Sequence, residues 1–211
     1  MKSKEKKKIS IKWKIPAKWT IFGLTMGVVL ATVGSIAALN GWFGGGGSIP
    51  EDTMTRGLVG YWNFDEGSGR VAHDSSNYAN NGVASSTWAT GKVGGAGQFD
   101  GVDEYASASS TSLNMTNNLT IELWVKFSST QVSAQYADPI SHGHSSTQGW
   151  VFQFNHTSPL TGTGVLMSNN GTTLYSLNYG SNLFDDQWHH LVAVKSSNPA
   201  IGMEIYKDGV R

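Results

Sequence analysis

A strict alternation of apolar and polar residues over Leu119–Phe127, in the segment LTIELWVKF, most narrows what this chain can fold into. Every second residue from Leu119 is apolar, and the residues between them are Thr, Glu, Trp and Lys. Successive side chains of a β-strand point to opposite faces, so this spacing predicts a strand with one buried face. Five further segments have strand-like composition: GLVGYWNF, WVFQFN, TTLYSLNY, WHHLVAVK and MEIYK.

Clusters of turn-forming residues, such as DSSNYANNG, SHGHSSTQG and KSSNPAIG, separate these predicted strands. No segment after residue 57 has the periodicity of a long amphipathic helix. Many short strands with turns between them predict an all-β fold, an antiparallel sandwich or barrel. The chain has no Cys, so disulfides and thiolate metal sites are excluded.

The first 50 residues differ in composition from the rest. Residues 1–18 hold eight of the fifteen Lys and Arg residues but one of the fifteen Asp and Glu residues, which leaves 7 basic and 14 acidic residues beyond them. Residues 19–50 have no ionisable side chain. About 20 apolar residues in a helix cross a membrane, so we predict a basic cytoplasmic tail over 1–18 and one transmembrane α-helix, a signal anchor, over 19–43. A buried core helix is the alternative for the apolar segment. A nucleic acid partner is not predicted, because the basic tail leads into an apolar segment.

Small residues within the predicted anchor favour a second property. Gly23, Gly27 and Ala31 recur every four residues, a spacing that lets two membrane helices approach closely and predicts self-association. Small residues over 35–37 also match a signal peptidase site, but the long Lys-rich region favours an uncleaved anchor. A Gly-rich linker over 44–57 then separates the anchor from the domain.

The motifs of the C-terminal part occur in an order that resembles one family. They are GLVGYWNFDEGSG, HDSSNYANNG, GKVGGAGQFDGVDEYASAS, LTIELWVKF, DDQWHHLVAVK and MEIYKDGVR, and together they cover nearly all of 58–211. This order resembles the laminin-G-like, concanavalin A-like lectin/glucanase family. The resemblance implies an antiparallel β-sandwich of the jelly-roll type, which in that family serves either glycan binding or glycoside hydrolysis.

The chain ends on EIYKDGVR, in which Asp-Gly predicts a tight β-hairpin. Only Val210 and Arg211 follow this turn, whereas the family continues with further strands. We therefore expect the domain over 58–211 to be incomplete at its C-terminus. Apolar side chains such as those of Val192 and Val194 should then be exposed.

Catalysis is not expected. Glycoside hydrolysis needs two carboxylates across the scissile bond, and related glucanases carry them on one strand as Glu-x-Asp-x-x-Glu. Glu122 is the single acidic residue of its predicted strand. His189 and His190 are adjacent on a strand and point to opposite faces, so we interpret them as structural rather than as ligands of one metal ion. His142 and His144 have same-side spacing if extended, but they lack a third zinc ligand in the sequence.

Calcium is the cofactor that the resemblance implies, as a structural ion. The loops HDSSNYANNG and FDGVDEY supply the oxygen ligands that Ca²⁺ prefers. Carried onto this chain, the resemblance assigns the metal site to Asp74, Asn80, Asp100 and Asp103. The alternative is that these side chains close turns by bonding to nearby backbone.

Aromatic residues near the polar loops are candidates for sugar binding, because exposed aromatic rings stack on sugar faces. Tyr136, Trp150, Tyr175 and Tyr179 have this position, and we expect ligand-binding residues among them. A place in the core is the alternative for each, since aromatic residues of a sandwich are mostly buried.

Three functions remain compatible with the sequence. We favour a membrane-anchored, non-catalytic recognition module that binds a glycan or a surface protein at the cell surface. A second interpretation is a pilin-like structural subunit, based on the basic leader and the Gly23 that precedes an apolar helix. A third is an accessory binding module of a larger polysaccharide-active enzyme. Cleavage after Gly23 with assembly into filaments would favour the second, and a catalytic part beyond Arg211 the third.

Overall fold

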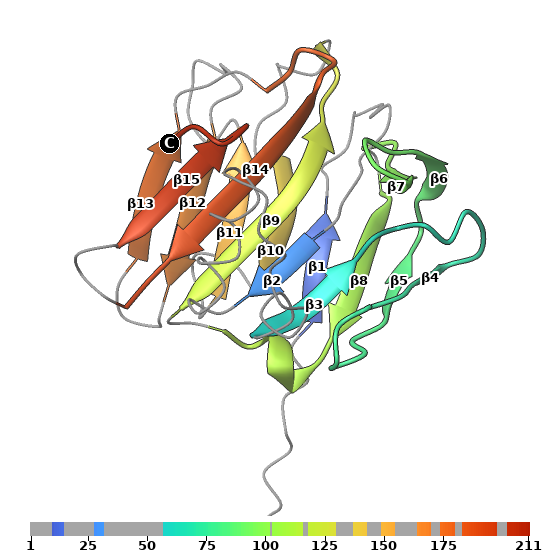
Figure 1. The fold of residues 1–211 in the computed structure, drawn as a ribbon, viewed down its shortest axis with the longest axis horizontal. Helices are drawn as coiled ribbons and strands as arrows, with labels where there is room; N and C mark the ends of the chain where they lie inside the picture. Colours follow the sequence, from blue (N-terminus) through green and yellow to red (C-terminus); the bar gives the residue numbers. More distant parts are fainter. Residues whose placement is uncertain are drawn as a thin grey trace, which may run out of the picture.

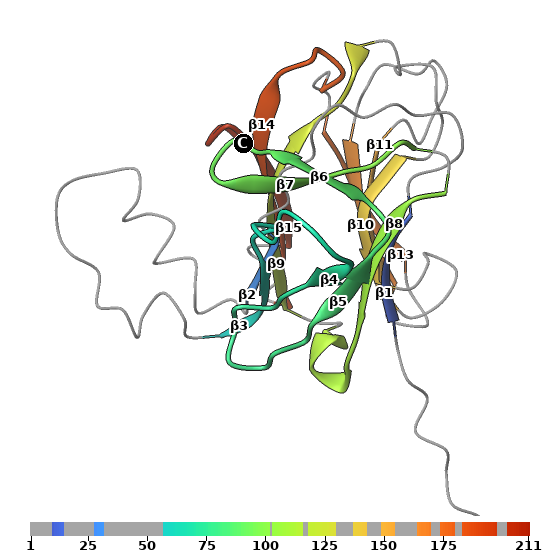
Figure 2. The ribbon, with the colours of Figure 1, turned by 90° about the vertical axis from the view of Figure 1, so that its right-hand side faces the viewer.

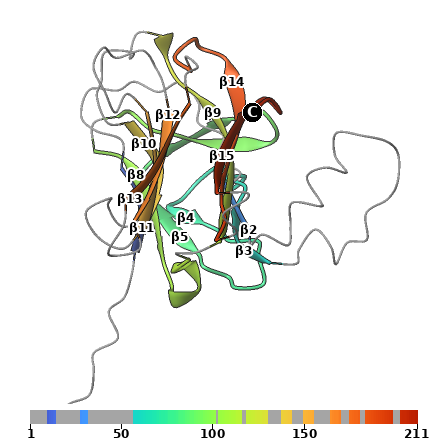
Figure 3. The same cartoon turned by 90° about the vertical axis from the view of Figure 1, so that its left-hand side faces the viewer.

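Two antiparallel sheets face each other in the computed structural model of the chain, as the edge views show (Figures 2 and 3). The structure describes residues 10–14, 28–31, 57–101, 103–115, 118–129, 137–142, 149–154, 164–169, 174–179, 183–197 and 202–211. One sheet has eight strands in the order β13-β12-β11-β10-β1-β8-β5-β4 (Figure 1). The other has five strands in the order β15-β14-β9-β2-β3, and β6 and β7 form a separate hairpin.

The eight-stranded sheet is formed by β1 (Ser10–Lys14), β4 (Val71–Ala72), β5 (Gly82–Ala84), β8 (Tyr105–Ser109), β10 (Ala137–His142), β11 (Gly149–Phe154), β12 (Gly164–Asn169) and β13 (Leu174–Tyr179). The five-stranded sheet is formed by β2 (Val28–Ala31), β3 (Leu58–Trp62), β9 (Leu119–Lys126), β14 (Trp188–Lys195) and β15 (Met203–Lys207). The hairpin consists of β6 (Thr87–Thr90) and β7 (Gly95–Gln98), and a short 3-10 helix, η2, spans Thr111–Leu113. The predicted all-β sandwich is therefore confirmed.

The core lies between the two sheets, and β9 shows how the sequence builds it. Leu119, Ile121, Leu123 and Val125 are all buried, whereas Trp124 and the charged residues of the strand are partly exposed. Burying one such aliphatic side chain contributes about 1.5–3 kcal/mol to stability. The alternation of β9 thus places its apolar residues against the opposite sheet, as the sequence predicts.

The predicted turn after β15 is present. Asp208 and Gly209 have φ of 51° and 80°, the left-handed conformation that Asp-Gly pairs adopt in tight hairpins. The amide of Val210 donates to the carbonyl of Lys207 at 2.9 Å, which closes the turn.

Two expectations about the sandwich need correction. Val192 and Val194 of β14 are buried, at 8% and 3% exposure, so the expected exposure of these side chains is wrong. Both lie opposite the core-facing Leu191 and Ala193 in the alternation of the strand. The five-stranded sheet therefore excludes solvent on parts of both of its faces.

The N-terminal residues also differ from the predicted helix over 19–43. Val28–Ala31 forms β2 between β3 and β9, where Leu30 pairs with Gly60 on one side and Ile121 on the other. β-branched residues such as Val favour a pleated sheet, and the backbone of this short segment is paired along both edges. Among the described residues, no helix is long and apolar enough to span a membrane.

The remaining parts of the N-terminal predictions lie mostly outside the described residues. These parts are 19–27, which includes Gly23 and Gly27, together with 32–43 and the predicted linker up to residue 56. Ser10–Lys14, within the predicted basic tail, forms β1 between β8 and β10 in the eight-stranded sheet. Each sheet thus has an interior strand that comes from the first 31 residues (Figure 1).

Candidate functional site

An aromatic and polar cluster lies on the face of the five-stranded sheet that points away from the core. We call it the Trp124 patch, and it consists of Tyr61, Lys92, Glu122, Trp124 and His190. Trp124 of β9 and His190 of β14 are directly opposite in the register, and their ring centroids are 5.0 Å apart with the planes tilted by 36°. Glu122 shares this face, and its Oε1 lies 2.8 Å from His190 Nε2.

Lys92 reaches the Trp124 patch from the β6–β7 hairpin, with Nζ 5.6 Å from the centroid of the Trp124 ring. This is a cation–π contact. The amide of Gly91 donates to the carbonyl of Gly94 at 2.9 Å and closes the turn that carries Lys92. The hairpin lies across one end of the two layers (Figure 2).

The β6–β7 hairpin is attached to the end of β3 through Asp65, whose Oδ1 accepts a hydrogen bond from the amide of Gly95. Glycine is required at this approach. A Cβ at Gly94 would lie 2.3 Å from Asp65 Oδ1, and a Cβ at Gly95 would lie 2.3 Å from the carbonyl oxygen of Phe64. These contacts hold the hairpin where its Lys92 side chain reaches Trp124.

Two carboxylates give the region around Tyr61 a negative potential. The pKa of the Tyr61 hydroxyl is raised first by burial and then by the negative charges of Asp65 and Glu122. Both charges disfavour the phenolate, so the Tyr61 side chain stays a neutral hydrogen-bonding group at neutral pH.

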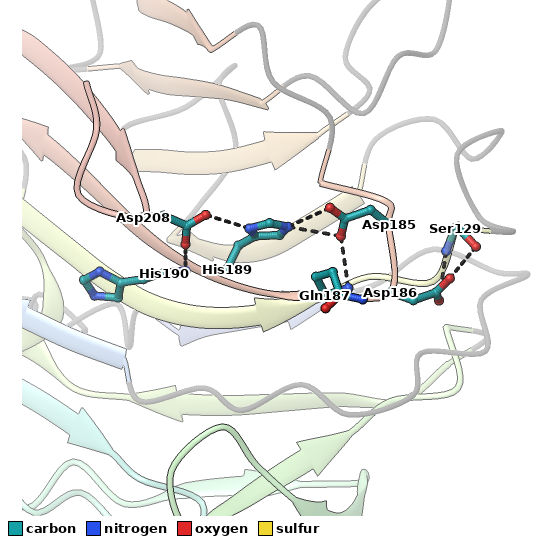
Figure 4. Close-up of polar contacts among 7 residues, drawn as sticks. All are labelled: Ser129, Asp185, Asp186, Gln187, His189, His190 and Asp208. Carbon is teal, nitrogen blue, oxygen red and sulfur yellow. Dashed lines mark hydrogen bonds and ion pairs between the residues drawn. The ribbon is translucent and has the colours of Figure 1, made fainter.

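His189 belongs to a second cluster, on the other face of β14 (Figure 4). Its Nδ1 lies 2.8 Å from Asp208 Oδ2, and its Nε2 lies 3.0 Å from Asp185 Oδ1. A carboxylate faces each ring nitrogen, so the doubly protonated imidazolium satisfies both contacts. The other Asp208 oxygen accepts a hydrogen bond from the amide of His190 at 2.9 Å. The cluster therefore joins the start of β14 to the turn after β15.

The charge of Asp208 is stabilised by this cluster. Burial raises the pKa of the Asp208 carboxyl, but the hydrogen bonds from His189 and from the His190 amide outweigh it, and the pKa is lowered. The nearby Asp186 carboxylate accepts from the amide and the hydroxyl of Ser129, which lower its pKa (Figure 4). These contacts account for Asp185, Asp186 and Asp208 as residues that connect strand ends. They agree with the structural interpretation of His189, and His189 and His190 do point to opposite faces.

The predicted metal residues fall into two places. The Asp74 carboxylate is buried and accepts hydrogen bonds from the amides of Tyr61, Ser76 and Asn80 and from the Ser76 hydroxyl, at 2.7–2.9 Å. The Asn80 side chain donates to the carbonyl of Val59 at 2.8 Å and accepts from the hydroxyl of Ser112 at 3.1 Å. These contacts fit the turn-closing alternative for Asp74 and Asn80.

Asp100 and Asp103 are exposed and lie beside Glu104. The pKa of Glu104 is raised by burial above all, a hydrogen bond from the Asp100 amide lowers it, and the charges of Asp100 and Asp103 raise it. Within the described ranges, no group of three or more His, Cys, Asp or Glu side chains is arranged to hold a metal ion. Calcium binding stays a prediction.

The predicted sugar-binding aromatics are not brought together as expected. Trp150 of β11 is 1% exposed and its ring stacks on the buried His142 ring at 5.9 Å, so the expectation of an exposed Trp150 is wrong. Its strand continues into the core next to Phe152. Tyr175 and Tyr179 lie in β13, where only the backbone is described, and Tyr136 lies outside the described residues, as does His144.

Trp124 is the residue that the sequence interpretation missed. It is an aromatic residue on the polar side of the alternating segment, and this position was the available signal. A large aromatic side chain on the outer face of a half-buried strand is partly exposed unless another element covers it. Its contacts with Lys92 and His190 depend on the hairpin and on the register of β14, which the alternation does not specify.

The fold and the outward-facing Trp124 patch define a β-sandwich domain with an aromatic surface suited to binding. A sequence profile for the concanavalin A-like lectin/glucanases superfamily, of the laminin G type, matches residues 100–211, more than half of the chain. The chain therefore belongs to this superfamily. The match includes Glu122, Trp124 and His190, whereas Tyr61 and Lys92 precede it. No curated protein and no solved structure matches the chain.

Proposed function

We propose that this chain is a non-catalytic recognition module that binds a carbohydrate or a protein through the Trp124 patch. The observation that carries this proposal is the partly exposed indole of Trp124, placed beside Glu122 and His190 on a rigid sheet face. Aromatic rings with hydrogen-bonding groups around them are the common anchors of binding surfaces. Such a face can stack on a sugar ring or hold an extended side chain of a partner.

The absence of catalysis in this proposal is supported by how the carboxylates near Tyr61 are engaged. Glu122 is bound to His190 at 2.8 Å, and the two Asp65 oxygens accept from the Gly95 amide and the Asn63 side chain. Glycoside hydrolysis needs one carboxyl group as an acid and a second as a nucleophile or base. Carboxylates held in these contacts are better suited to shaping a binding surface.

A surface location and a membrane anchor over 19–43 remain part of the proposal, supported by the lack of ionisable side chains over 19–50. Self-association through Gly23, Gly27 and Ala31 belongs to the same part. Val28–Ala31 cannot lie in the membrane while it forms β2, so anchoring requires this strand to leave the sheet. Carbonate extraction of membranes from expressing cells tests the anchor, and recovery of the chain in the soluble fraction would contradict it.

The binding site is tested with Trp124→Ala in the full chain, on glycan arrays and in titrations with the ligands found there or with a candidate surface protein. Loss of a central aromatic anchor is expected to weaken binding about 30-fold. Tyr78→Ala is the matched control, because Tyr78 is 56% exposed and lies in the loop between β4 and β5, outside the Trp124 patch. Unchanged binding by a folded Trp124→Ala variant, or an equal loss in the Tyr78→Ala variant, would contradict the assignment.

A further inference from the structure

The Trp124 patch already holds a positively charged group, the ammonium of Lys92. Its Nζ lies 5.6 Å from the Trp124 ring centroid, within the range of a favourable cation–π interaction. Lys92 comes from a separate hairpin, so this contact does not follow from neighbourhood in the sheet. The ring is positioned by β9, and the cation is brought to it by the β6–β7 turn.

The surroundings of this ring favour cations for a second, independent reason. Glu122 lies on the same face of β9, and the negative charges of Glu122 and Asp65 both act on the nearby Tyr61 hydroxyl. Beyond residue 18 the chain carries 14 acidic and 7 basic residues, so the long-range field of the domain also attracts cations. An anionic group would approach the patch against both effects.

The backbone that carries Lys92 is held, but its side chain is free to leave the ring without moving that backbone. The Gly91–Gly94 hydrogen bond and the Asp65–Gly95 contact attach the turn to the end of β3. Lys92 is exposed, and four rotatable bonds connect its ammonium to the backbone. An external cation can therefore replace the Lys92 ammonium through a side-chain rotation alone.

We propose that the Trp124 patch binds an ammonium group of the kind that a lysine side chain of a partner protein presents, and that Lys92 is an internal competitor for this position. The inference rests on the proposed binding function and specifies the ligand group that the patch selects. Trp124 supplies the ring face, and Glu122 and Tyr61 supply the polar surround. Lys92 lowers the apparent affinity by the fraction of time that it occupies the ring.

The test uses the full chain and two short peptides as probes, Ac-Gly-Lys-Gly-NH₂ and the same peptide with an acetylated lysine. Binding is followed through the NMR signal of the Trp124 indole N–H, assigned with Trp124→Phe. We expect the lysine peptide to shift this signal and the acetylated peptide to leave it unchanged. In Lys92→Met, which keeps the length but removes the charge, the affinity for the lysine peptide should rise about two- to fivefold, the range expected for losing one exposed cation–π competitor.

Lys126→Met is the matched control, because it makes the same change in net charge on the same face of β9. Its affinity for the lysine peptide should stay close to that of the unchanged chain. An equal gain in Lys126→Met would show that general repulsion is being relieved and would overturn the inference. So would a lack of gain in Lys92→Met, or binding of glucuronate that is lost in Lys92→Met, since the latter would make Lys92 a contact for anionic sugars. These results are separate from the effect of Trp124→Ala on binding, which tests the proposed function itself.

Discussion

Replacing Asp74 by alanine should strongly destabilise the domain, whether or not calcium is present. The buried Asp74 carboxylate accepts hydrogen bonds from three backbone amides and one hydroxyl. These donors belong to Tyr61, Ser76 and Asn80, so one side chain connects β3 to the loop between β4 and β5. Alanine removes the acceptor and leaves the donors where they are.

The magnitude follows from how well water can reach the donors that remain. An unsatisfied buried donor costs about 1–3 kcal/mol. The Asn80 amide is buried, whereas the amides of Tyr61 and Ser76 are partly buried and recover some hydration. We therefore expect Asp74→Ala to lower the free energy of unfolding by about 3–5 kcal/mol.

Urea denaturation of the full chain measures this loss, once with a chelator and once with added calcium. Asp74→Asn should lose less, because one of its side-chain atoms still accepts hydrogen bonds. Asp103→Ala is the control for an exposed acidic residue and should stay within about 0.5 kcal/mol of the unchanged chain. A loss below about 1 kcal/mol in Asp74→Ala would refute the hydrogen-bond argument. A loss that occurs only with calcium present would replace it with a metal site.

Three further substitutions test other contacts by the same denaturation assay. His189→Leu should lower the free energy of unfolding by about 1–3 kcal/mol because it leaves two carboxylates without their donor, whereas the exposed His73→Leu should cost less than about 0.5 kcal/mol; equal losses would contradict this. His142→Phe should raise stability by about 1–2 kcal/mol, since both nitrogens of this buried ring lack a hydrogen-bond partner within the described part of the chain. Burial lowers the pKa of His142, so the folded chain binds fewer protons than the unfolded chain, and the advantage of His142→Phe should grow as the pH falls below 6.5; a constant difference between pH 7 and pH 5 would contradict it. Gly94→Ala should cost about 2–3 kcal/mol and Gly67→Ala about 1 kcal/mol, because both glycines have φ of 65° but only the first would also meet a neighbouring side chain; equal losses would remove the argument from close approach.

The alternation of β9 was sufficient to predict a half-buried strand and the all-β class, because burial on one face of a strand depends only on the period of the sequence. WHHLVAVK and MEIYK were predicted for the same reason and form β14 and β15. The N-terminal segment was not predictable in this way. Its length and lack of charge satisfy the requirements of a membrane helix, whereas its place as β2 depends on strand edges more than 25 residues away in the sequence.

The candidate site shows the same limit. The sequence places Trp124 on the polar side of its strand, but its neighbours depend on the register of β14 and on a hairpin held by Asp65. Trp150 was predicted at the surface because polar residues flank it, and it is buried because its ring packs against His142 in the core. Nearness to a polar loop does not report burial, since a strand end can turn inward within one residue.

The interior positions of β1 and β2 make the domain behave as a split protein. Each is a strand of five or four residues that joins the two parts of a sheet, and together they connect both layers to the first 31 residues. A peptide bond cut between β2 and β3 would leave two fragments with complementary hydrogen-bonding edges. Such fragments should reassociate on mixing, so an N-terminal fragment could serve as a detachable switch for the integrity of the fold.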